Sequence, residues 1–362
     1  MNKVLSFFKE NESQYPIIKN IRVYGWEFEY DHLIVSSLSK YLFEDLDIIE
    51  NIAPETNENR DGRIREKKYI TVHDTGDTDF RHTAKFWSET VYKQGWEQGP
   101  YSASFQYVTG NDGIYHNIPD NEIAYHAGDS TQFDYKLYDT NVTGENEKPV
   151  VTISEDGYYE VDGKKTILLA PRAYKTWKEK VVIDRIAKTS DINDQGVLCK
   201  LIDGKYYIGE TYYSPTYEKI SNRGGNNNSI GIESCITVGT DIYLTWQKTA
   251  KLVAKLLNDN NLSFDDIKQH HYFSGKNCPQ TIRMNGFWEH FIDLVKMEYQ
   301  VLQFKQEGYK IELSVNDERV KANGRILLRD FNKDDEIEYT ISTIKDGVKE
   351  ELKFKKVLKK FN

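Results

Sequence analysis

The feature that most constrains this chain is a segment in which an imidazole and a thiol lie eight positions apart. His270 and Cys278 flank a Gly-Lys turn, and Pro279 follows the cysteine. Far upstream, residues 68–73 form an apolar run that predicts a buried strand ending in His73. Two histidines and one cysteine make three protein ligands for zinc, and a catalytic zinc site needs three because its fourth position binds water.

Composition narrows the classes of partner. The length of 362 residues predicts two or three modules, and 38% hydrophobic residues suffice for a buried core. The net charge of −9 and the pI of about 5.5 argue against nucleic acid or an anionic membrane as partner, because both need a basic face. The first ten residues lack an apolar core and a cleavage site, and no stretch is long enough to span a bilayer. We therefore expect no secretory signal and no membrane insertion.

The cysteines do not predict a disulfide framework. Cys199, Cys235 and Cys278 are an odd number of thiols at wide spacing, which is typical of reduced cysteines. We expect Cys199 and Cys235 to lie in cores, which leaves Cys278 for chemistry.

The pattern of apolar and turn-forming residues divides the chain into four parts. Residues 1–60 are predicted to form an N-terminal extension that ends in a polar loop. Residues 61–132 and 226–302 predict one α/β domain, with a central mixed sheet flanked by helices. Repeated Asp-Gly turns in residues 133–225 predict a β-rich insertion. Residues 303–362 alternate like strands and predict a small C-terminal β module, for which an immunoglobulin-like fold is open.

Single elements can be predicted within these parts. The main ones are helices over residues 81–93, 245–258 and 287–302, and strands over 68–73, 102–110, 114–118 and 229–236. Thr245 is the expected N-cap of the second helix. Residues 173–187 fit a helix and a strand equally well.

Five motifs occur in order along the chain, and each of them is weak alone. They are His73 at a strand end, Ser104-Phe105-Gln106-Tyr107, His126-Ala127-Gly128-Asp129, Asn226 before residues 229–233, and His270 with residues 275–279. In this order they resemble the zinc-dependent N-acetylmuramoyl-L-alanine amidases of the peptidoglycan recognition protein fold, the type 2 amidase family. The phage endolysin and Bacillus autolysin branch is the most similar. The resemblance covers roughly residues 65–132 and 226–300.

The resemblance implies a Zn²⁺ site held by His73, His270 and Cys278. His271 is the competing ligand, but the family spacing of eight residues before the cysteine selects His270. Alternation along an extended segment would also turn only one of these two histidines toward the metal. Asp74 follows His73 where Asn or His is common in the family, so it either supports the ligands or caps the loop.

Two further residues match catalytic positions of the family. Glu233 falls on its carboxylate position at the end of a central strand, where it would pass a proton to the leaving amine. Lys276 falls where the family helps to polarise the scissile carbonyl. A surface glutamate at a strand end and a solvent-facing turn lysine are the alternatives for these two residues.

Three residues match the family's substrate groove. The resemblance implies that His126, Phe105 and Asn226 bind substrate, although packing explains Phe105 equally well and Asn227 and Asn228 compete with Asn226. Gln106 replaces a frequent histidine and cannot titrate. The insertion falls between two groove motifs, so it must emerge near the cleft. Extension of the groove, gating and oligomerisation all remain open for it.

The activity implied by the resemblance is hydrolysis of the amide between N-acetylmuramic acid and L-alanine in bacterial peptidoglycan. Without a secretory signal, a phage endolysin or tail lysin is expected, made in the cytoplasm and acting on the cell wall after release. A wall-binding role is then open for the C-terminal module. Two alternatives remain, a non-catalytic peptidoglycan-binding protein on the same fold and a zinc peptidase that cuts the stem peptide. The sequence predicts no oligomeric state.

Overall fold

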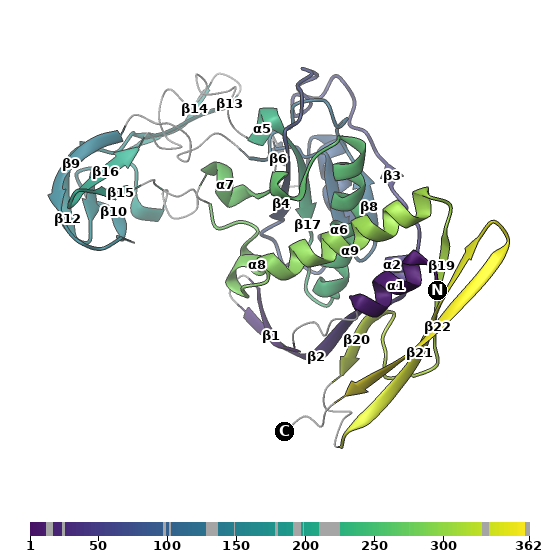
Figure 1. Ribbon diagram of the computed structural model, residues 1–362. Coiled ribbons are helices and arrows are strands. Elements are labelled where there is room, and N and C mark those ends of the chain that lie inside the picture. The colour runs from purple at the N-terminus through teal and green to yellow at the C-terminus, as the bar shows by residue number, and fades with distance from the viewer. Residues whose placement is uncertain are drawn as a thin grey trace.

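In a computed structural model, a six-stranded mixed sheet forms the centre of the molecule (Figure 1). Its strand order is β18 (Ile267–Gln269), β4 (Tyr69–Asp74), β17 (Ser229–Ser234), β7 (Tyr107–Gly110), β8 (Gly113–His116) and β3 (Ile49–Glu50). The first four strands run parallel, and β8 turns back antiparallel to β7. The structure describes residues 1–11, 17–23, 26–96, 99–100, 103–127, 137–147, 149–177, 180–190, 197, 199–209, 225–274, 276–327 and 333–358.

The two faces of this sheet pack against different helices. On one face, α6 (Ile242–Asp259) and α9 (Trp288–Gln306) cover alternate strand residues in the largest apolar cluster. These strand residues include Ile70, Val72, Ile230 and Ile232. On the other face, α3 (Ala84–Lys93) packs over β7 and β8. Because side chains alternate along a strand, His73 and Glu233 lie on the face opposite α6 and α9. The mixed sheet with flanking helices confirms the expected fold class.

Helix α6 begins earlier than predicted. Its N-cap is Asp241, whose carboxylate accepts a hydrogen bond from the Leu244 amide at 3.2 Å, so the expectation of Thr245 as N-cap was wrong. Thr245 lies within the first turn and is buried, and its hydroxyl accepts a hydrogen bond from Asn111 Nδ2 at 2.9 Å. The tertiary contact with the β7–β8 turn uses the hydroxyl that the prediction had assigned to capping.

Short elements complete the central domain. They are β5 (Gly95–Trp96), β6 (Gly99–Pro100), α5 (Gly225–Asn228), a 3₁₀ turn η2 (Phe264–Asp266), α7 (His270–Ser274) and α8 (Gln280–Met284). All three cysteines are unpaired. Among the described helices, none is long and apolar enough to cross a membrane.

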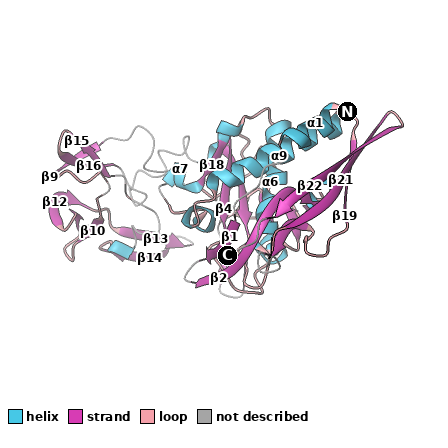
Figure 2. Cartoon of the chain, turned by 60° about the horizontal axis from the view of Figure 1, so that its bottom comes forward, coloured by secondary structure: helices cyan, strands magenta, loops and turns pink. Residues whose placement is uncertain are grey.

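The insertion is built from strands and stands to one side of the central sheet (Figures 1 and 2). Its strands are β9 (Leu137–Thr143), β10 (Val151–Ile153), β11 (Tyr158–Val161), β12 (Lys164–Leu169), β13 (Ala173–Trp177), β14 (Lys180–Arg185), β15 (Cys199–Ile202) and β16 (Lys205–Gly209). They form two three-stranded sheets and the β13–β14 hairpin, so residues 173–187 take the strand alternative. Asp162-Gly163 and Asp203-Gly204 have positive φ at both residues, as tight hairpin turns require.

The two ends of the chain pack together around the end of α9. The N-terminal elements are α1 (Lys3–Glu10), β1 (Ile17–Val23), β2 (Trp26–Ser39) and α2 (Lys40–Phe43). The C-terminal elements are β19 (Lys310–Val315), β20 (Asn323–Leu327), β21 (Asp335–Lys345) and β22 (Val348–Leu358). Strand β20 pairs with β2, and one apolar cluster joins Phe8, Val35, Phe304 and Tyr339. The predicted extension and the predicted module therefore share one core.

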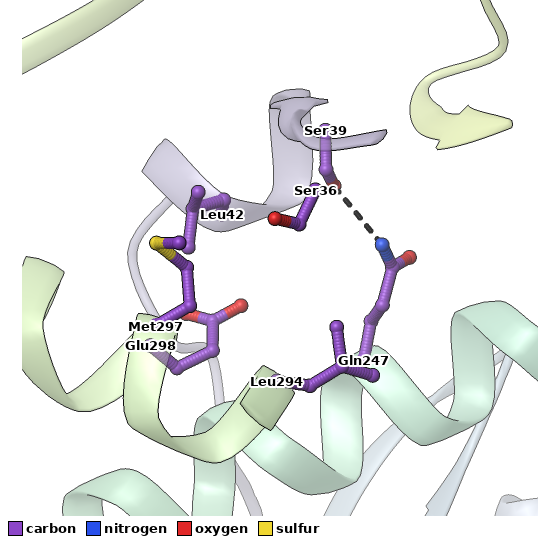
Figure 3. Close-up of a pocket in the computed structure, with 7 residues that line it drawn as sticks. All are labelled: Ser36, Ser39, Leu42, Gln247, Leu294, Met297 and Glu298. Carbon is purple, nitrogen blue, oxygen red and sulfur yellow. Dashed lines mark hydrogen bonds between the residues drawn. The ribbon is translucent and has the colours of Figure 1, made fainter. Parts of the chain in front are cut away.

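A small cavity lies where the N-terminal segment meets α6 and α9 (Figure 3). Its lining residues are Ser36, Ser39, Leu42, Gln247, Leu294, Met297 and Glu298. The Glu298 carboxylate is almost fully buried and pairs with the Lys251 ammonium at 2.8 Å. Burial raises the pKa of Glu298 to about 7, although Lys251 opposes the shift.

Candidate metal centre

The first part of the centre comes from two neighbouring parallel strands. In the register of β4 and β17, His73 pairs with Glu233 at the carboxyl ends of the strands. The side chain of His73 is only 1% exposed and that of Glu233 is 15% exposed. Glu233 Oε1 lies 3.8 Å from His73 Nδ1. The alternation that buries Val72 and Ile232 against α6 and α9 thus turns these two polar side chains to the opposite face.

The second part comes from the chain after β18. This strand ends at Gln269 beside β4, so His270 begins α7 next to the end of β4. Residues 270–274 are helical, so the expected extended segment was wrong. The junction between strand and helix, and not strand alternation, places His270 toward His73. His271 is not part of this group of possible ligands. Its main-chain amide donates to the Cys278 carbonyl at 3.1 Å, and this hydrogen bond holds the Cys278 segment beside the start of α7.

The three predicted ligands meet at one point. One possible ligand atom from each of His73, His270 and Cys278 lies within 4.8 Å of the other two, and all three residues are buried. Cys278 Sγ lies 3.7 Å from His73 Nδ1. In a tetrahedral zinc site, a ligand nitrogen and a ligand sulfur lie about 3.6 Å apart. Across the part of the chain that the structure describes, no second group of this kind occurs.

The charge states of these side chains suit a soft or borderline cation. Burial lowers the pKa of His73 and of His270 well below the usual value, so both imidazoles are neutral and can donate a lone pair. Burial raises the pKa of the Cys278 thiol, with a further contribution from Asp74. A buried neutral thiol must lose its proton to bind a metal, and such a loss is strongly favoured when the cation is Zn²⁺. The donor set therefore fits zinc.

Glu233 is a largely buried carboxyl group that lies beside His73. Burial raises its pKa to about 8, while the charge of Lys276 opposes the shift. Its second oxygen, Oε2, is buried and has no hydrogen-bond partner among the described residues. A carboxyl group in this state can both accept and deliver a proton near neutral pH.

Lys276 lies on the exposed part of the loop that precedes the cysteine ligand. Its carbonyl accepts a hydrogen bond from the Cys278 amide at 2.7 Å, so the two residues share one tight turn. Its positive charge contributes to the low pKa of both His73 and His270. Lys276 is therefore the cation at the mouth of the centre.

Asp74 supports the loop that carries the cysteine. One carboxylate oxygen accepts a hydrogen bond from the Thr281 amide at 2.7 Å, and the other lies 3.9 Å from Cys278 Sγ. Asp74, the last residue of β4, thus lies beside the Cys278 sulfur and binds the first turn of α8.

His126, expected in the substrate groove, lies behind a predicted ligand. Its Nδ1 is 2.9 Å from His73 Nε2, and the two rings meet edge to face at 90°. The imidazole packs over Gly231 of β17, where an added Cβ would come within 2.5 Å of the ring. Burial lowers the pKa of His126 to about 3, so the ring is neutral.

The other two predicted groove residues have contacts that explain them structurally. Phe105 is buried in the apolar cluster under α3. Asn226 and Ala127 clasp each other, because the Asn226 side-chain oxygen accepts from the Ala127 amide at 2.7 Å and the Asn226 amide donates to the Ala127 carbonyl at 2.9 Å. This clasp closes the base of the insertion.

The sequence had also offered a signal for one of two buried residues beneath the centre. Gln106 bridges strands, since its amide donates to the Glu122 carbonyl at 2.9 Å and accepts from the Gly231 amide at 2.7 Å. Lys67 was not singled out, yet its ammonium is buried and donates to the Glu122 carbonyl at 2.8 Å. Lys67 precedes β4, which is buried on both faces, so no alternation along the strand signalled its burial.

Comparison with known proteins identifies the family to which the chain belongs. Residues 63–281 match the N-acetylmuramoyl-L-alanine amidase family, Amidase_2. The chain is 30% identical over 96 residues to the N-acetylmuramoyl-L-alanine amidase CwlA of Bacillus subtilis, which covers 26% of this chain and 35% of CwlA. It is 32% identical over 73 residues to the amidase CwlH of the same organism, covering 20% of this chain and 28% of CwlH. The chain thus spans only about a third of the length of the curated relatives that it matches.

Solved structures give a more distant likeness. The catalytic domain of XlyA aligns with 69% of this chain and 99% of its own length, at 19% identity and a TM-score of 0.41. PlyL aligns with 69% of this chain and 97% of its own, at 15% identity and a TM-score of 0.40.

Proposed function

Because this chain belongs to the N-acetylmuramoyl-L-alanine amidase family, we propose that it hydrolyses the amide between N-acetylmuramic acid and L-alanine in bacterial peptidoglycan, with Zn²⁺ as cofactor. One observation carries the proposal. One possible ligand atom from each of three buried residues lies within 4.8 Å of the other two. The Glu233 carboxyl group lies beside them, with Oε1 3.8 Å from His73 Nδ1 and Oε2 buried without a hydrogen-bond partner among the described residues. Those are the parts that metal-assisted amide hydrolysis needs.

Different residues of the protein would bind the metal and transfer the proton. His73, His270 and Cys278 would hold the ion, and their burial keeps bulk water from competing for it. A bound Zn²⁺ supplies Lewis acidity, which lowers the pKa of water and polarises a carbonyl group. Glu233 accepts the proton that the attacking water loses and delivers it to the leaving nitrogen. What supports this role is the 3.8 Å distance between Glu233 Oε1 and His73 Nδ1, which puts the carboxyl group beside a predicted ligand.

Lys276 acts on the developing negative charge. As an exposed cation on the loop that precedes Cys278, it can approach the oxygen of a scissile carbonyl. A positive charge at this point stabilises the transition state more than the neutral substrate.

The two alternatives differ from this proposal in what they require. A binding protein without catalysis needs neither the cysteine ligand nor a buried carboxyl group beside it, and the chain has both. A zinc peptidase would use the same centre on another amide, so only the products separate it from the amidase. Wall lysis as a phage endolysin or tail lysin, after release from the cytoplasm, belongs to our proposal on the strength of the family alone.

Product analysis tests the proposal. Zinc-loaded protein would be incubated with purified peptidoglycan, and the digest analysed by mass spectrometry. We expect free stem peptides with an L-alanine N-terminus and intact glycan chains. Cleavage within the peptide would establish the peptidase, and binding without any release would establish the non-catalytic protein. Either result would overturn the proposal.

A further inference from the structure

The imidazole of His126 stands directly behind the His73 ring. The ligand side of His73 is its Nδ1, which faces Cys278 Sγ at 3.7 Å and Glu233 Oε1 at 3.8 Å. The opposite nitrogen, Nε2, lies 2.9 Å from His126 Nδ1. The ring of His73 therefore has one nitrogen for the metal and one for a second histidine.

The contact defines which nitrogen carries a proton. A ligating Nδ1 must offer its lone pair, so the neutral His73 ring must carry its proton on Nε2. His73 Nε2 then donates to His126 Nδ1, which must accept. The neutral His126 ring in turn carries its proton on Nε2, a buried nitrogen that has no hydrogen-bond partner among the described residues. The order of protons follows from a single requirement at the metal.

The position of His126 is determined by the sheet and by the base of the insertion. Its ring rests on Gly231, and no side chain fits between them. The next residue, Ala127, is clasped by Asn226 through the two hydrogen bonds described above. His126 is thus held at a strand and at the point where the insertion leaves the domain.

We propose that His126 is a positioning residue, which orients His73 and selects its Nε2-protonated form so that Nδ1 is free for the metal. The inference rests on the proposed function and replaces the expectation that His126 binds substrate. Acceptors placed behind a ligating histidine commonly change metal affinity by about 10- to 100-fold. The metal whose binding His126 would support is a divalent zinc ion.

Paired substitutions in the full chain test the acceptor. His126→Leu removes it at similar bulk, and we expect the zinc dissociation constant, measured by competition with a chromogenic chelator, to rise about 10- to 100-fold. His126→Asn places an amide oxygen near the position of Nδ1 and should recover most of the affinity. His290→Leu is the matched control, because His290 is also buried and neutral, bonds to the Tyr243 hydroxyl at 2.8 Å and lies outside the centre. It should bind zinc like the wild type.

The outcomes separate this inference from the proposed function. Wild-type affinity in folded His126→Leu, or an equal loss in both His126 variants, would overturn the positioning role. If His126→Leu does not fold, long-range ¹H–¹⁵N NMR of the zinc-loaded wild type decides instead. Protonation of His73 on Nε2 supports the inference, and protonation on Nδ1 overturns it. A wild type that binds no zinc and releases no peptide would refute the proposed function itself.

Discussion

Two buried carboxyl groups in this molecule have different surroundings. Glu298, at the cavity where the chain ends meet the central domain, pairs with Lys251 at 2.8 Å (Figure 3). Glu233, at the metal centre, has one oxygen 3.8 Å from His73 Nδ1 and another that is buried without a partner in the described parts of the chain. Burial raises the pKa of both, to about 7 for Glu298 and about 8 for Glu233.

The difference separates a structural carboxyl group from one available for chemistry. Burying an unsatisfied polar oxygen costs free energy, so a fold that keeps one needs a compensating role for it. Glu298 has its compensation in Lys251, whose ammonium also donates to the Leu42 carbonyl at 3.1 Å. Glu233 has no such ion pair among the described residues, and its other oxygen, Oε1, lies beside the predicted ligand His73. A raised pKa alone would not have told the two apart.

The largest effect is expected from the ligand beside Glu233. Cys278→Ser replaces a thiolate with a poor zinc ligand, so zinc binding and peptide release should both fall below detection. Equilibrium dialysis with metal analysis, and the release of stem peptides, measure the two. Cys235→Ser is the matched control, because Cys235 is a buried thiol in the cluster under α3. It should lose some stability and keep zinc. Retained activity in Cys278→Ser would show that catalysis does not depend on the proposed metal centre, and Glu233 would then have no metal centre to serve.

The direct comparison is the same substitution at both carboxyl groups. Glu233→Gln removes proton transfer, and we expect the turnover rate to fall by about 10² to 10⁴ while zinc remains bound. Glu298→Gln should leave turnover at the wild-type level, because its cavity lies where the N-terminal segment meets α6 and α9 and not at the metal centre. Initial rates on purified peptidoglycan and zinc content would be measured in parallel. Equal rates in the two variants would mean that the contrast between them has no catalytic meaning.

Glu298 should instead affect the pH dependence of stability. Its folded pKa lies above the ordinary value of 4.5, at about 7, so the folded chain holds this proton more tightly than the unfolded chain does. Its contribution is complete below the unfolded pKa and is lost as the pH rises through the folded pKa. A shift of this size is about 3 kcal/mol.

Chemical denaturation between pH 4.5 and 8 checks this expectation. The free energy of unfolding of the wild type should decline with rising pH by about 3 kcal/mol more than that of Glu298→Gln. Parallel curves for the two proteins would show that the buried pair does not titrate on unfolding.

The smallest effect is expected from the cation at the mouth of the centre. Lys276→Met should lower the turnover rate about tenfold, because an exposed charge is screened by water and stabilises the transition state only in part. Lys255→Met on α6, whose ammonium pairs with Asp259, controls for loss of a surface charge. Unchanged turnover in Lys276→Met would limit the chemistry to the ligands and Glu233.

Local patterns predicted a large part of this molecule. Short apolar runs in residues 68–73 and 229–236 predicted the two strands that carry His73 and Glu233. Asp-Gly pairs predicted the hairpin turns of the insertion, where φ is positive at Asp162 and Asp203. Such features depend on neighbours along the chain, so the sequence contains all the information that they need.

The sequence by itself thus determined the candidate ligand residues, the strands that carry His73 and Glu233, and the family, because residue types and short-range periodicity can be read along the chain. Only the tertiary structure decided the rest. It placed His126 behind His73, turned Asn226 into a clasp, buried Phe105 under α3 and joined the two chain ends in one core. Each of these outcomes depends on contacts between residues far apart in the chain, and no local pattern specifies which distant side chain fills a given space.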